Sequence, residues 1–99
     1  AGIGPGIMVT KDPIPKDTII KMWIKRNGNT EFEGETTISM LKRNFDELIH
    51  YLTIECDFPK GVYLMTGTCI VPDLPFTLKS GDEIFIQINP IGTLKQVVK

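Results

Sequence analysis

The chain has 99 residues, 41% of them hydrophobic, and a formal net charge of −1, which is typical of one small globular domain. Its 11 basic and 12 acidic residues are nearly balanced, so no positively charged surface for nucleic acid is expected. No apolar run is long enough to cross a membrane, and the first residues lack the pattern of a signal peptide. We therefore expect a cytoplasmic protein with neither nucleic acid nor a membrane as partner.

A chain this short buries only a modest core, which favours support from a partner chain or from a segment outside it. Its two cysteines, Cys56 and Cys69, could form one disulfide but not a structural zinc site by themselves. Nothing in the sequence indicates secretion, so both are interpreted as reduced thiols.

The first third of the chain predicts a short strand and then a hairpin. Gly6 to Thr10 reads as a short strand, followed by a loop in which two prolines forbid regular pairing. Thr18 to Arg26 alternates apolar and polar residues with a period of two, the clearest strand pattern in the chain. Asn27-Gly28 favours a tight turn, so Thr30 to Glu35 is predicted as the return strand.

Three acids alternate along that return strand: Glu31, Glu33 and Glu35. Glu33 and Glu35 would point to the same side and could bind a hard cation. No third ligand is evident nearby, so we interpret these carboxylates as a solvated face.

The hydrophobic period then changes to that of a helix. Five apolar residues fall on one helical stripe: Leu41, Phe45, Leu48, Ile49 and Leu52. The pattern predicts an amphipathic helix from Met40 to Thr53, with Ser39 or Thr37 as its N-cap. His50, the single histidine, lies on this helix without a serine, cysteine or second histidine at the spacing of a catalytic pair. We interpret it as a partly exposed side chain and not as a general base.

Short strands are predicted for the rest of the chain: Val62 to Met65, which continues beyond Thr66 to Thr68 as Cys69 to Val71, and then Glu83 to Ile88 and Thr93 to Val98. With about six strands and a single helical segment, a βαβαβ unit is not expected. The predicted fold class is mostly β (α+β), a curved mixed β-sheet with one amphipathic helix packed on it.

Thr66, Gly67 and Thr68 form the best candidate for a binding site. A strand that runs into a glycine between two hydroxyl side chains presents N–H and O–H groups that can hold a carboxylate or keto oxygen. From the residues alone, a glycine kink where strands bend explains the pattern equally well. No nucleophile–base pair is present, so no catalytic residue is assigned.

A set of motifs in chain order resembles the C-terminal portion of the fumarylacetoacetate hydrolase superfamily. The motifs are Gly4-Pro5-Gly6-Ile7-Met8-Val9-Thr10, Thr36-Thr37-Ile38-Ser39-Met40, Asp46-Glu47-Leu48-Ile49, Leu64-Met65-Thr66-Gly67-Thr68, Leu78-Lys79-Ser80-Gly81-Asp82-Glu83-Ile84 and Ile91-Gly92-Thr93-Leu94. After Thr68, the stretch Cys69-Ile70-Val71-Pro72 followed by Phe76-Thr77-Leu78 is similar to the 2-keto-3-deoxy-arabinonate dehydratase branch, which acts in sugar-acid breakdown.

The resemblance implies a magnesium-dependent lyase that acts on 2-oxo acids and dehydrates 2-keto-3-deoxy sugar acids such as 2-keto-3-deoxy-arabinonate. The related alternatives are a C–C bond hydrolase or a decarboxylase of acylpyruvate-type substrates. A non-catalytic β-rich binding module is the alternative outside enzymes. Thr68 is similar to the residue that contacts the substrate carboxylate in the family, while Gly67 would allow close approach and Thr66 would support them.

The resemblance also implies that the metal site lies elsewhere. The metal carboxylates of the family, a Glu-x-Glu pair and a further acid, precede the Gly-Pro motif, as does a lysine near the substrate. Glu33 and Glu35 have that spacing at a different place in the chain, so no metal role is transferred to them. Residues 1–99 are thus expected to be the C-terminal portion of a larger enzyme that forms homo-oligomers, with Mg2+ on upstream residues and no activity in this portion alone.

Overall fold

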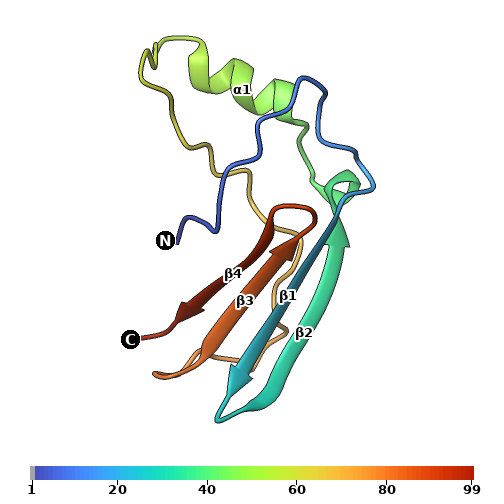
Figure 1. Cartoon of the computed structure of the whole chain (residues 1–99), viewed down its shortest axis with the longest axis vertical. Helices are drawn as coiled ribbons and strands as arrows, with labels where there is room; N and C mark the ends of the chain where they lie inside the picture. Colours follow the sequence, from blue (N-terminus) through green and yellow to red (C-terminus); the bar gives the residue numbers. More distant parts are fainter. Residues whose placement is uncertain (1) are drawn as a thin grey trace.

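A computed structural model describes residues 2–99 as a sheet and one α-helix. The elements in chain order are β1 (Ile19–Arg26), β2 (Asn29–Thr37), the 3-10 helix η1 (Ile38–Met40), α1 (Phe45–Thr53), β3 (Glu83–Ile88) and β4 (Gly92–Val97). The strands form one sheet in the order β2-β1-β3-β4 (Figure 1). The predicted class, mostly β with one helix, is confirmed.

The β1–β2 hairpin forms where the sequence predicts it. Asn27 and Gly28 both have positive φ angles, 51° and 81°, as the tight turns that join twisted antiparallel strands require. From this turn, β2 pairs with β1 as far as Ile19 and Thr37, with one register shift between Ile24 and Lys25.

The β1–β3 pair forms the centre of the sheet. Ile24 lies opposite Ile84 and is 3% exposed, because alternation turns the apolar residues of both strands to one face. Trp23 and Phe85 lie opposite each other on the other face, with stacked rings whose centroids are 5.2 Å apart. Cross-strand pairs of this kind stabilise the register of a sheet.

Two predicted strands are wrong. The first is Gly6–Thr10, and the second is the strand predicted in two pieces, Val62–Met65 and Cys69–Val71. Neither has regular secondary structure. A short apolar run becomes a strand only where a neighbouring strand pairs with it, and within residues 2–99 neither segment joins the sheet. The sheet consequently has four strands, and every pairing is antiparallel, so the expected mixed pairing is wrong as well.

The helix is shorter than the apolar stripe suggests. It begins at Phe45, because the Asn44 side chain accepts a hydrogen bond of 2.7 Å from the backbone N–H of Glu47, the geometry of an N-cap. The predicted caps Thr37 and Ser39 instead hydrogen-bond each other through their hydroxyls at 2.7 Å, at the turn into η1. His50 is exposed, as expected.

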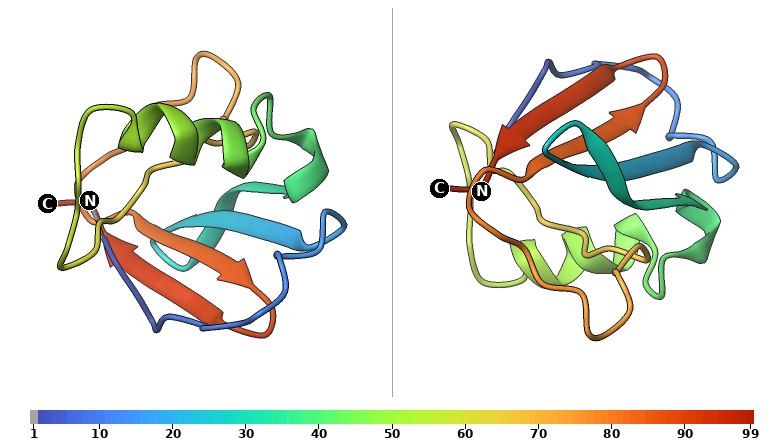
Figure 2. Two further views of the ribbon diagram at one scale, coloured as in Figure 1. Left: turned by 90° about the horizontal axis from the view of Figure 1, so that it is seen from above. Right: turned by 90° about the horizontal axis from the view of Figure 1, so that it is seen from below.

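The helix lies on one side of the sheet (Figure 2). No residue of α1 is fully buried, and the long connection between α1 and β3 lies on the same side of the sheet as the helix (Figure 2). Ile70 lies on this connection. Within the described residues, Ile70 and Ile24 are the buried hydrophobic side chains.

A buried ion pair fixes the end of the connection to β1. The Arg26 guanidinium donates to both carboxylate oxygens of Asp82, each at 2.7 Å, and Asp82 is 0% exposed. The hydrogen bond from Arg26, aided by the backbone N–H of Lys79, lowers the pKa of Asp82 from 3.8 to about 2. Such a bidentate pair is geometrically specific and holds the turn before β3 in one position.

Candidate functional site

Thr66, Gly67 and Thr68 lie on the connection between α1 and β3, outside any strand, and all three are exposed. Gly67 has a φ angle of 87°, in the left-handed region that favours glycine over residues with a side chain. The space where a side chain at Gly67 would stand is open. A ligand can therefore approach the backbone of this segment closely.

The Thr68 hydroxyl is oriented by the chain that follows it. It accepts a hydrogen bond of 3.1 Å from the backbone N–H of Ile70. Its own contact to the Ile70 carbonyl oxygen is 3.4 Å, long for a hydroxyl donor. The hydroxyl proton is thus free to turn to a stronger acceptor, such as a carboxylate oxygen.

The next residue attaches the segment to η1, the 3-10 helix that follows β2. The Cys69 thiol donates to the backbone carbonyl of Met40, the last residue of η1, at 3.0 Å. Cys69 and Cys56 are both free and exposed, which agrees with the interpretation of two thiols. Cys69 is thereby a natural reporter of this segment, and Cys56 is a matched thiol outside it.

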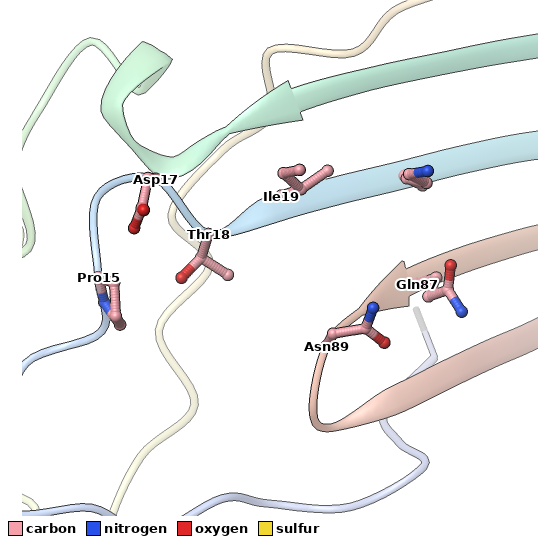
Figure 3. Close-up of a pocket in the computed structure, with 7 residues that line it drawn as sticks. Pro15, Asp17, Thr18, Ile19, Gln87 and Asn89 are labelled. Atoms are coloured by element: carbon pink, nitrogen blue, oxygen red, sulfur yellow. The ribbon is translucent and has the colours of Figure 1, made fainter.

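A hollow lies at the other end of β1 from the hairpin turn (Figure 3). It measures about 390 Å³ and is lined by Pro15, Asp17, Thr18, Ile19, Lys21, Gln87 and Asn89. The Lys21 side chain forms an ion pair with Glu35, with 3.6 Å between Nζ and Oε2. Thr66 to Thr68 do not line the hollow. The structure therefore does not join this hollow to the predicted binding segment.

The described residues do not form a metal centre. Glu33 and Glu35 are exposed on β2. Nowhere in residues 2–99 do three histidine, cysteine, aspartate or glutamate side chains come together as a cation site would require. The same residues contain no helix long and apolar enough to span a bilayer.

Comparison with known proteins decides the family. Residues 1–99 match the fumarylacetoacetate (FAA) hydrolase C-terminal family over their whole length. The chain belongs to the FAA hydrolase family. The resemblance inferred from the ordered motifs is therefore confirmed.

Within the FAA hydrolase family, two relatives are sugar-acid dehydratases by name. The chain is 36% identical over 97 residues to a probable 2-keto-3-deoxyxylonate dehydratase of Haloferax volcanii, a match that covers 97% of this chain and 34% of the relative. It is 40% identical over 98 residues to the 2-dehydro-3-deoxy-D-arabinonate dehydratase of Saccharolobus solfataricus, covering 97% and 33%. The chain thus spans about a third of the length of these relatives.

A solved structure shares the fold of this FAA hydrolase chain. A 2-keto-3-deoxy-D-arabinonate dehydratase in complex with magnesium and 2,5-dioxopentanoate superposes with a TM-score of 0.81 at 38% identity. The match covers 91% of this chain and 31% of that one. The resemblance to the sugar-acid dehydratase branch, suggested by the residues after Thr68, is confirmed.

Reasoning from the sequence missed two features of this FAA hydrolase chain. The Arg26–Asp82 pair joins positions far apart in the sequence, and no local pattern indicates it. The contact of Gly34 with Ile70 had a signal, because a glycine inside a strand often marks a close approach of another segment.

Proposed function

We propose that this chain is the C-terminal part of an enzyme that removes water from 2-keto-3-deoxy sugar acids, with 2-keto-3-deoxy-arabinonate as a candidate substrate. The supporting observation is the 36% and 40% identity over nearly the whole chain to two proteins named as dehydratases of such acids. The complex of a relative with magnesium and 2,5-dioxopentanoate supports a 2-oxo acid as the class of ligand.

In this proposal the chain supplies part of the wall that binds the substrate carboxylate. The Thr68 hydroxyl donates a hydrogen bond to one carboxylate oxygen, because it only accepts in its hydrogen bond from the Ile70 N–H. Gly67 lets the carboxylate approach the backbone, since no atom of residues 2–99 stands within 4 Å of the position where its side chain would be. Thr66 supports the segment from the preceding position. The chain binds and orients the substrate carboxylate, and no proton-transferring residue is assigned to it.

Any magnesium ion in the parent enzyme would be bound outside this chain. The described residues of this chain do not fit a magnesium site, so the ion would be held by residues outside it. When bound, such an ion supplies Lewis acid stabilisation of the negative charge that develops on the keto oxygen of a 2-oxo acid.

The chain exposes apolar surface that another part of the parent enzyme could cover. Large hydrophobic side chains are exposed along the connection and the first residues, among them Met65 at 83%, Leu74 at 92% and Val9 at 91%. Exposed apolar surface of this extent is typical of a surface that another part of a protein covers. We propose that the remainder of the parent enzyme covers it, in a cytoplasmic homo-oligomer.

Alkylation of the two cysteines tests the binding segment directly. The intact enzyme is treated with iodoacetamide with and without the 2-keto-3-deoxy acid, and the extent at Cys69 and Cys56 is read by peptide mass spectrometry. We expect the acid to slow alkylation of Cys69, which follows Thr68 in the chain, and to leave Cys56 unchanged. Equal rates at Cys69 with and without the acid, under conditions of turnover, would remove Thr66 to Thr68 from the site.

Turnover by the same enzyme separates the alternatives. Loss of water from 2-keto-3-deoxy pentonates is the result that the proposal requires. Cleavage of acylpyruvates alone would keep the family and replace dehydration by C–C bond hydrolysis. Binding of these acids without any turnover would favour the non-catalytic module.

A further inference from the structure

Gly34 lies inside β2, opposite Met22 of β1. A glycine inside a strand weakens it, because glycine has no side chain to pack. An ideal Cβ built at Gly34 would lie 2.9 Å from Cγ2 of Ile70 and 3.3 Å from the nearest atom of the Phe32 ring. The Ile70 side chain therefore fills the space that a side chain at position 34 would need.

Ile70 links this notch to the binding segment. Its side chain is buried, at 8% exposure, and its backbone N–H donates to the Thr68 hydroxyl at 3.1 Å. Between them, the Cys69 thiol donates to the Met40 carbonyl. Thr68 is therefore held against β2 and η1 through Ile70 and Cys69.

We propose that Gly34 and Ile70 are positioning residues for substrate binding by Thr68. The notch at Gly34 receives Ile70, and Ile70 sets the place and direction of the Thr68 hydroxyl. This inference rests on the proposed function, in which Thr68 contacts the substrate carboxylate. A side chain at position 34 would push Ile70 out of the notch and carry the hydroxyl with it.

Gly34→Ala in the intact enzyme tests the notch. Gly34 is not among the glycines with positive φ, so alanine is compatible with its backbone and the added methyl acts through the contact with Ile70. We expect KM for the 2-keto-3-deoxy acid to rise roughly tenfold with a smaller change in kcat, because displacements well below 1 Å are costly at a binding group. Alkylation of Cys69 should become faster, since its bond to Met40 loosens.

Gly6→Ala is the matched control. Gly6 also lacks a positive φ angle, and among the described residues nothing lies within 4 Å of the position of its added Cβ. This variant should keep the wild-type KM and the wild-type rate of Cys69 alkylation.

The double variant Gly34→Ala/Ile70→Leu should restore binding. Leucine lacks the Cγ2 methyl that the new alanine would meet, while it keeps the size of isoleucine. We expect its KM and Cys69 alkylation rate to return most of the way to wild type. If Gly34→Ala does not fold, Ile70→Ala tests the same contact from the other side and should raise both KM and the rate of Cys69 alkylation.

Two results distinguish this inference from the proposed function. A Gly34→Ala enzyme with a lower unfolding midpoint, but with the KM and Cys69 alkylation rate of the Gly6→Ala control, would overturn the positioning role. If Thr68→Val leaves KM unchanged while Gly34→Ala still speeds Cys69 alkylation, the role of Thr68 in binding falls and the positioning of the segment by Gly34 stands.

Discussion

The four-stranded sheet and the connection between α1 and β3 are held together in different ways. In the sheet, Ile20 to Lys25 of β1 are fixed by backbone pairing on both sides, with β2 and with β3. The connection has no such ladder and is fixed at a few points, chiefly Ile70 against Gly34 and Asp82 on Arg26. The position of the candidate binding segment therefore depends on single contacts, whereas that of the sheet depends on a repeated pattern of backbone pairs.

The largest stability effect is expected from the centre of the sheet. Ile24→Ala removes a side chain that is 3% exposed, and should lower the free energy of unfolding by about 3 kcal/mol through lost burial and the cavity left behind. Hydrogen exchange of β1 amides in the intact enzyme measures the effect. The control is Ile19→Ala, because Ile19 is 47% exposed and should cost well under half as much. Equal effects at the two positions would contradict the assignment of the inner face.

The attachment of the connection through Asp82 should make the stability of the fold sensitive to acid. The pKa of Asp82 is about 2 in the folded chain, below its ordinary 3.8, because Arg26 hydrogen-bonds the carboxylate. A depressed folded pKa adds stability that is fully present above the ordinary pKa and is lost as the pH falls from about 4 to 2. Asp82→Asn should lower the unfolding midpoint at neutral pH and flatten its decline across this acid range. Asp73→Asn, at an exposed position of the same connection, should keep the wild-type decline. An unchanged slope in Asp82→Asn would exclude the ion pair as its source.

A smaller effect is expected at the helix. Asn44→Ala removes the side-chain acceptor for the Glu47 N–H and should cost about 1 kcal/mol of helix stability. Hydrogen exchange in α1 measures this loss. Ser39→Ala should leave α1 unchanged, since Ser39 does not cap it. The reverse order of effects would restore the longer helix that the apolar stripe predicted.

The same contrast explains what the sequence could predict. The period of two in β1 and the Asn27-Gly28 turn are local signals, so the hairpin and the antiparallel β3–β4 pair were found close to their true bounds. The start of the helix was not predicted correctly, because both Asn44 and Ser39 are suitable N-cap residues. The hydrogen bond from the Glu47 N–H to the Asn44 side chain decides the boundary. The apolar run at Val62–Met65 carries the pattern of a strand without a partner strand in the described residues.

The candidate site was predictable as a motif and not as a geometry. Thr66 to Thr68 stand out by residue type, and the role assigned to them stays a prediction. Their attachment through Ile70 and Cys69 joins distant parts of the chain. The periodicity of a sequence does not predict such contacts, although a glycine inside a strand, Gly34, indicated a close approach of another segment there.

The most direct test of the central claim is the kinetics of Thr68→Val and Thr68→Ser in the intact enzyme, with water loss from a 2-keto-3-deoxy pentonate followed by NMR. Valine keeps the shape of threonine and removes the hydroxyl, while serine keeps the hydroxyl. We expect a KM about tenfold higher for Thr68→Val, because one hydrogen bond to a charged group is lost, and a near wild-type KM for Thr68→Ser. An unchanged KM in Thr68→Val, or the absence of dehydration by the wild-type enzyme, would contradict the central claim.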